Sequence, residues 1–98
     1  MEKIDKLHIM DKVLRELEDL VNSETALLKK LGQIEADNMN VGNKELEQEL
    51  PNIYEHVDNA LTESTNLLSS YSATREKFVK DNDLEAIIAN ANIAPGSL

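Results

Sequence analysis

The stretch "LVNSETALLKKL", residues 20–31, decides the helical pattern of the chain. Its apolar residues recur at steps of three and four, which is the spacing of one face of an α-helix. Glu24 occupies a position on this face where the pattern calls for an apolar residue. The stretch therefore predicts a helix and raises the question of what a carboxylate does on its apolar side.

Two overlapping apolar series extend outward from this stretch. The first steps like a coiled-coil seam and consists of Leu7, Met10, Leu14, Leu17, Val21, Glu24, Leu28 and Leu31. The second runs beside it and consists of Val13, Leu17, Leu20, Glu24, Leu27, Leu31 and Ile34. A narrow seam serves one partner helix, whereas a wide apolar face packs against two or more. We therefore expect a first helix over about residues 3–35 that belongs to a helix bundle.

A second long helix is predicted over about residues 45–78, after a polar loop at about residues 36–44. The loop is rich in asparagine and contains Gly42, and both residue types favour turns. The apolar series of the second helix is Leu46, Leu50, Ile53, Val57, Ala60, Ser64, Leu67 and Tyr71. Pro51 removes one helical hydrogen bond, and the sequence leaves open whether it kinks this helix or precedes it.

Residues 1–80 are thus expected to form an antiparallel helical hairpin, and residues 81–98 a short helix and a frayed tail. Asp81 or Asp83 is suited to cap that helix, which should run through Ala89 before Pro95. Two helices bury only the strip where they touch, so about half of the large apolar side chains would stay exposed. The predicted fold is all-α, with the hairpin completing a four-helix bundle with a partner chain.

The composition excludes several classes of function. The net charge is −9, and no lysine or arginine occurs between Glu45 and Thr74, so no basic patch for nucleic acid or an anionic membrane is visible. The acidic stretch is either a solvated face or a surface for a basic partner. The chain has no cysteine and no apolar run long enough to span a membrane. We expect an intracellular protein.

The sequence offers no converging set of catalytic or metal-binding residues. His8 and His56 fall on different predicted helices, and neither has a matching set of ligands. We therefore expect no enzymatic activity, no cofactor and no metal, and a small-molecule or metal-binding protein is a weak alternative. For Glu24 three interpretations stay open: a carboxylate at the edge of the face, a specificity contact with a partner lysine, arginine or hydroxyl, or a catalytic group.

The first predicted helix, "KIDKLHIMDKVLRELEDLVNSETALLKKLGQIEADN", resembles the first helix of subunit 11 of the Mediator head module. The segment "LPNIYEHVDNALTESTNLL" is similar to that family's second helix, with Tyr54, Glu55, Val57 and Asp58 at matching positions, and "SSYSATR" follows it. The resemblance covers about residues 3–75; the part after Lys80 does not match. It implies a nuclear, non-enzymatic subunit whose hairpin pairs with Mediator subunit 22 and docks on subunit 17, in transcription by RNA polymerase II.

The resemblance also implies which residues contact the partner. They are Leu14, Leu17, Val21, Leu28 and Leu31 on the first helix and Ile53, Val57, Ala60, Leu61 and Leu68 on the second. Glu24 joins them as the candidate specificity contact. The alternative function is a homodimeric helical chaperone or a kinetochore-type coiled-coil adaptor, in which the partner is a second copy or another coiled-coil chain.

Overall fold

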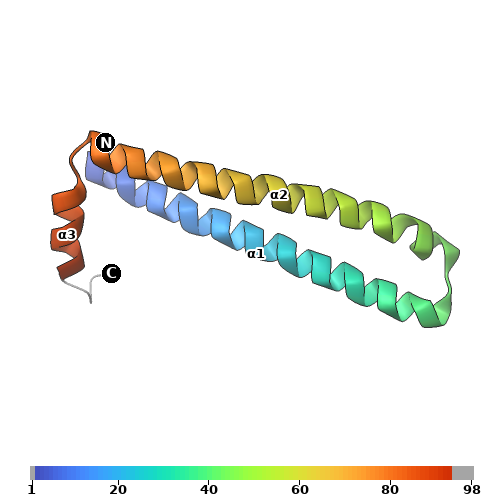
Figure 1. Ribbon diagram of the computed structural model, residues 1–98. Helices are drawn as coiled ribbons and strands as arrows, with labels where there is room; N and C mark the ends of the chain where they lie inside the picture. The colour runs from blue at the N-terminus through green and yellow to red at the C-terminus, as the bar shows by residue number, and fades with distance from the viewer. Residues whose placement is uncertain (1, 94–98) are drawn as a thin grey trace.

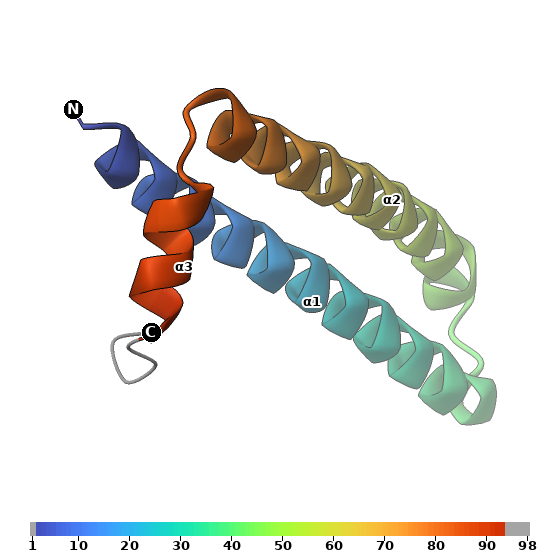
Figure 2. The same ribbon diagram turned by 60° about the vertical axis from the view of Figure 1, so that its left-hand side comes forward.

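A computed structural model describes the backbone of residues 2–93 and the side chains of residues 2–89. It consists of the helices α1 (Lys3–Val41), α2 (Lys44–Asp81) and α3 (Glu85–Ile93). The helices α1 and α2 run side by side in opposite directions, and α3 lies across the end of the hairpin that contains the start of α1 (Figures 1 and 2). The predicted all-α hairpin with a short third helix is confirmed. The predicted frayed tail at Pro95 lies outside the described residues.

The hairpin is long and thin, with extents of 61 × 27 × 18 Å. Its radius of gyration is 20.1 Å, whereas a compact chain of this length has a radius of gyration of about 13 Å. The structure therefore has no central globular core. Most of its burial is confined to the line along which α1 and α2 touch.

A heptad seam joins the two long helices. Its α1 residues are buried or half-buried at every level: Leu7, Met10, Leu14, Leu17, Val21, Glu24, Leu28, Leu31, Glu35 and Asn38. Its α2 residues are Leu50, Val57, Leu61, Ser64, Leu68, Tyr71, Arg75 and Phe78. The alternation of three and four residues is that of antiparallel coiled-coil packing. The first series of the sequence is thus the seam between the two helices of this chain.

The turn is much shorter than the nine-residue loop predicted from the sequence. Helix α1 continues to Val41, and only Gly42 and Asn43 separate it from α2. Gly42 has φ of 71°, a left-handed conformation that ends helices and that glycine adopts without strain. Asparagine weakens a helix by only about half a kcal/mol, so α1 can continue through the asparagine-rich stretch when its last turn is held by hydrogen bonds.

Asn38 and Asn43 supply those hydrogen bonds. The buried Asn38 side chain donates to the backbone oxygen of Asn43 at 3.1 Å and accepts from its backbone nitrogen at 2.9 Å. The Asn43 side chain in turn accepts from the backbone nitrogen of Leu46 at 2.9 Å and so caps α2. These bonds fix the turn and therefore the register in which α1 and α2 pair.

Pro51 lies inside α2, eight residues after its capping residue Asn43. The helix therefore neither starts at Asn52 nor breaks at Leu50. Because proline has no backbone N–H, the carbonyl of Glu47 has no i+4 helical donor. Pro51 is exposed, so water can reach this part of the helix.

Helix α3 closes the open end of the hairpin. Leu7, Val79 and Leu84 form a buried cluster, against which Ile4, Phe78 and Ile88 pack. The predicted caps of this helix are wrong: Asp81 is the last residue of α2 and pairs with Lys77, and Asp83 has φ of 51° in the connection. Beside this cluster, Arg75 bonds Asp11 with 2.9 Å between Nε and Oδ1.

Candidate partner-binding surface

The seam divides the surface of the hairpin into two flanks of opposite chemistry. On one side of the seam, a depression is lined by residues of both helices: Leu14, Glu18, Thr65, Leu68, Ser69 and Ser72. Glu18 follows the seam residue Leu17, whereas Thr65 and Ser72 follow the seam residues Ser64 and Tyr71. Residues that directly follow these seam positions in either helix therefore lie on the same flank.

We call this side the polar flank. Between the two ends of the hairpin it consists of Asp11, Glu18, Thr25 and Gly32 on α1 and Asp58, Thr65 and Ser72 on α2. At its open end, Ile4 and Val79 occupy equivalent positions and pack with α3. The chain thus covers the open end of this flank with its own third helix, and apart from Gly32 the middle of the flank exposes polar side chains. At the hairpin tip, Met39 and Pro51 continue the two series of this flank and are exposed.

The opposite side, the apolar flank, is made of residues that precede seam positions, together with the residues that continue these series at seven-residue intervals. These are Val13, Leu20, Leu27, Ile34 and Val41 on α1 and Leu46, Ile53, Ala60 and Leu67 on α2. The turn and the Asp11–Arg75 pair set the register, which places Leu20 level with Leu67 and Ile34 level with Ile53. The apolar flank is therefore a ladder of apolar pairs along most of the hairpin.

Solvent reaches these side chains. Leu20, Leu27, Ile53 and Leu67 are 44%, 49%, 45% and 53% exposed. Among the described side chains only six apolar ones are buried, against eleven large apolar ones that are exposed, and seven of those eleven belong to the apolar flank. Fully burying such a half-exposed side chain is worth on the order of 1 kcal/mol. Exposure of this kind in one continuous strip is typical of an interaction surface.

The apolar flank has the size of a protein interface. The 28 residue steps from Val13 to Val41 span about 42 Å, and two helices side by side are about 20 Å wide. The projected area is therefore roughly 800 Å², which is about what each partner buries in a standard interface. Ile9 and Met39 lie exposed near the two ends of the hairpin.

The structure places the sequence-predicted interface residues in two environments. Nine of them line the seam, where the other helix of the same chain covers them: Leu14, Leu17, Val21, Glu24, Leu28, Leu31, Val57, Leu61 and Leu68. The remaining two, Ile53 and Ala60, lie on the apolar flank. Contact of the seam residues with a partner stays a prediction, but their packing is already used to hold the hairpin together.

Glu24 is a half-buried seam residue. Its Oε1 atom is buried and accepts no hydrogen bond from the described residues. The neighbouring Thr25 bonds the backbone oxygen of Val21 at 2.9 Å instead. An unpaired buried acceptor costs about 1–3 kcal/mol. Glu24 is thus a polar interruption that weakens the isolated seam at its middle.

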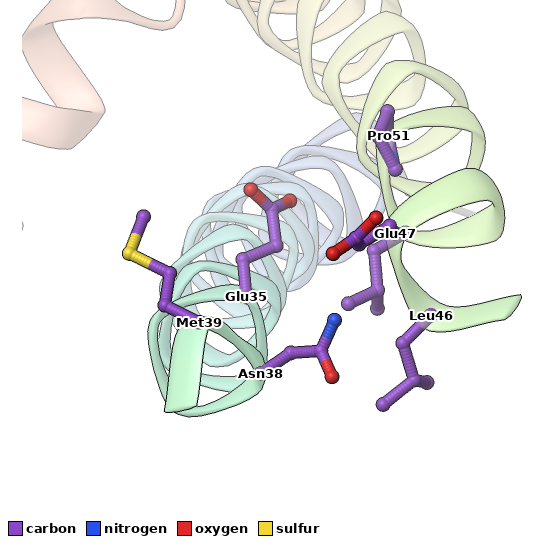
Figure 3. Close-up of a pocket in the computed structure, with 7 residues that line it drawn as sticks. Glu35, Asn38, Met39, Leu46, Glu47 and Pro51 are labelled. Carbon is purple, nitrogen blue, oxygen red and sulfur yellow. The ribbon is translucent and has the colours of Figure 1, made fainter. Parts of the chain in front are cut away.

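A second depression lies at the hairpin tip, between the end of α1 and the start of α2 (Figure 3). It is lined by Glu35, Asn38, Met39, Leu46, Glu47, Leu50 and Pro51. Figure 3 shows the carboxylates of Glu35 and Glu47 facing this space from the two helices. Glu47 is paired with Lys44 at 3.3 Å. The depression is open and shallow, and it continues the apolar flank through Leu46.

Of the apolar flank, only Ile53 and Ala60 were predicted as interface residues from the sequence, although a signal for the whole flank exists. Val13, Leu20, Leu27, Ile34 and Val41 recur at a strict interval of seven residues, as do Leu46, Ile53, Ala60 and Leu67. Each series alone looks like one edge of a wide face. Only the register of the hairpin shows that both edges lie on the same side.

The described residues contain no group of three or more His, Asp or Glu side chains that could hold a metal ion. None of the helices in the described part of the chain is long and apolar enough to cross a membrane. Comparison with known proteins gives no match to a family model, to a curated protein or to a solved structure.

Proposed function

We propose that this chain is a non-enzymatic subunit of a multiprotein assembly, and that its hairpin completes a four-helix bundle with a helical partner. The observation that carries the proposal is the apolar flank, a ladder of half-exposed leucine, isoleucine and valine side chains on one side only. A second pair of helices laid on this flank would bury it and produce the two-layer packing of a four-helix bundle.

The position of α3 supports the same function. The chain uses its own third helix to cover Ile4 and Val79 at the end of the opposite flank. The apolar flank receives no such cover from the described residues. The intramolecular packing therefore covers the apolar open end of one flank and leaves the apolar residues of the other flank available to a second polypeptide.

The specific assembly that we propose is the Mediator head module, with subunits 22 and 17 as partners and the nucleus as location. The support for this choice is the resemblance of residues 3–38 and 50–75 to the helices of subunit 11. A hairpin with one free apolar flank is the form that pairing with another hairpin requires.

Co-expression with Mediator subunits 22 and 17 tests this proposal. The tagged full chain should co-purify with subunit 22 as a defined heterodimer in size-exclusion chromatography, and subunit 17 should join that complex. Leu27→Asp places a charge in the centre of the apolar flank and should reduce recovery of the complex at least tenfold. Thr65→Asp, on the polar flank, is the matched control and should leave recovery unchanged.

Two outcomes would contradict the proposal at different levels. Absence of any complex with subunits 22 and 17 removes the Mediator assignment but leaves the bundle-completing role. A chain that is monomeric at high concentration, and that binds no dye specific for exposed apolar surface, removes the role itself, because its apolar flank would then not be available.

A further inference from the structure

Charged residues border the apolar flank, and we call this border the rim. Their charges favour one kind of binding partner. The rim borders the apolar flank on the side away from the seam. It consists of residues that lie three positions after a residue of the apolar flank: Glu16, Ser23, Lys30 and Asp37 on α1, and Glu49, His56 and Glu63 on α2. All seven side chains are exposed. Four of them are acidic and one is a lysine. Any chain that covers the apolar flank must place its own flanking residues against this rim.

The rim carboxylates are free to pair with an incoming chain. No ion pair within residues 2–89 involves Glu16, Asp37, Glu49 or Glu63; the acidic partners there are Asp11, Glu47, Glu76 and Asp81. Along α2 the rim carries the acids Glu49 and Glu63 with His56 between them, and the helix has no lysine or arginine between Glu45 and Thr74. The α2 side therefore offers negative charge only.

A second copy of this chain fits the rim poorly. If the two-fold axis runs parallel to the helices, α1 of one copy covers α2 of the other at the same level. Glu49 then lies beside Asp37 of the second copy, and His56 beside its Lys30. If the axis is perpendicular to the helices, α1 covers α1, and Glu16 lies beside Asp37 of the second copy. Both symmetric arrangements create a like-charge contact at the rim, and each copy brings a net charge of −9.

We infer that the apolar flank is covered by a different polypeptide, an amphipathic helix or helical hairpin whose apolar stripe is bordered by lysine or arginine. The inference rests on the proposed function and specifies its partner. Glu49 and Glu63 lie 14 residues apart, which is about 21 Å along the helix. The basic residues that face α2 should therefore be spaced by about two heptads. Charge complementarity of this kind selects partners and speeds their encounter more than it adds affinity.

Two synthetic helices of five heptads provide the probe. Both carry the same leucine and isoleucine stripe, one with lysine and the other with glutamate at all positions bordering the stripe. Binding to the full chain is measured by fluorescence anisotropy at low salt and at high salt. We expect the lysine-bordered helix to bind about tenfold more tightly at low salt, and high salt should reduce this preference because it screens the exposed pairs.

Charge reversal locates the effect on the rim. Glu49→Lys/Glu63→Lys should remove the preference for the lysine-bordered helix or reverse it in favour of the glutamate-bordered one. Glu55→Lys/Asp58→Lys makes the same change in charge on the same helix, but away from the apolar flank, and should keep the preference within about twofold of that of the unchanged protein. Circular dichroism checks that both variants are helical.

Three other outcomes of these experiments would contradict the inference. Equal affinity for the two helices overturns the inference about the rim and leaves the bundle-completing function standing. A dimer of the chain in sedimentation equilibrium that Leu20→Asp dissociates shows a second copy on the apolar flank and overturns the inference as well. A monomer that binds neither helix contradicts both the inference and the proposed function.

Discussion

The two flanks of the hairpin are built on the same backbone and differ in what the chain does with them. On the polar flank, the apolar residues at the open end are packed against α3, the middle carries mainly hydroxyl and carboxylate groups, and Asp11 is paired with Arg75. The apolar flank repeats leucine, isoleucine and valine at seven-residue intervals and stays half exposed. Under the proposed function, the residues that hold the fold and those that bind the partner are therefore separate sets, although both follow a heptad pattern.

The largest effect on the isolated chain should come from the buried end cluster and not from the apolar flank. Leu7 is 1% exposed, and Leu7→Ala should lower the free energy of unfolding by about 3 kcal/mol. Leu27→Ala, on the apolar flank, should lower it by less than about 1 kcal/mol because half of that side chain is already in water. Urea unfolding followed by circular dichroism measures both. Equal losses would mean that the apolar flank belongs to the fold of the single chain.

A smaller effect of opposite sign is expected at Glu24. Glu24→Leu removes the unpaired Oε1 atom and continues the apolar seam, so it should raise the free energy of unfolding by about 1–2 kcal/mol. Glu18→Leu, on the polar flank, is the control and should change stability by less than about half a kcal/mol. Thermal melting of both variants tests this, and a loss of stability in Glu24→Leu would show that the carboxylate is satisfied within the folded chain.

The two described glycines in the hairpin should respond in opposite directions. Gly32 is helical on the polar flank with open space where a Cβ would be placed, so Gly32→Ala should stabilise the chain by about 0.5–1 kcal/mol. Gly42 has φ of 71°, so Gly42→Ala should destabilise it by about 1 kcal/mol. The comparison by chemical denaturation separates backbone strain in the turn from helix propensity, and it fails if both changes have the same sign.

The smallest effect should be that of the ion pair on the polar flank. Asp11→Asn replaces the carboxylate that accepts from Arg75 and should cost about half a kcal/mol at low salt, because both side chains are partly exposed. The loss should shrink in high salt. The same measurement on Lys44→Gln, whose partner Glu47 is more exposed, should show a smaller change. A loss above about 2 kcal/mol would give the polar flank a larger part in stability than its burial indicates.

Several elements of the fold could be predicted because they depend on local pattern. The series from Leu7 to Leu31 fixed a helix and its inward side, and it forms the seam of the hairpin. The prediction was less successful at the turn, where asparagine was taken to end α1 about six residues before Val41. The hydrogen bonds between Asn38 and Asn43 link residues that a propensity argument treats separately, so their effect was not foreseen.

The candidate partner-binding surface, like the fold, could be predicted from the sequence only in part. On α2, the series from Leu46 to Tyr71 mixes seam residues such as Val57 with flank residues such as Ile53. A period of seven residues cannot distinguish these positions, since both satisfy it equally well. Their separation depends on the rotation of α2 about its own axis, which is set by contacts with α1 and not by the sequence of α2.

The sequence by itself determined that this protein has two long amphipathic helices, because the spacing of apolar residues along a helix is a local property of the chain. It also determined that these helices hold more apolar surface than two of them can hide. The tertiary structure alone decided which stripe faces inward. That choice follows from the two-residue turn and the contacts between α1 and α2, which fix the register of the two helices and bring both half-exposed apolar series to one side.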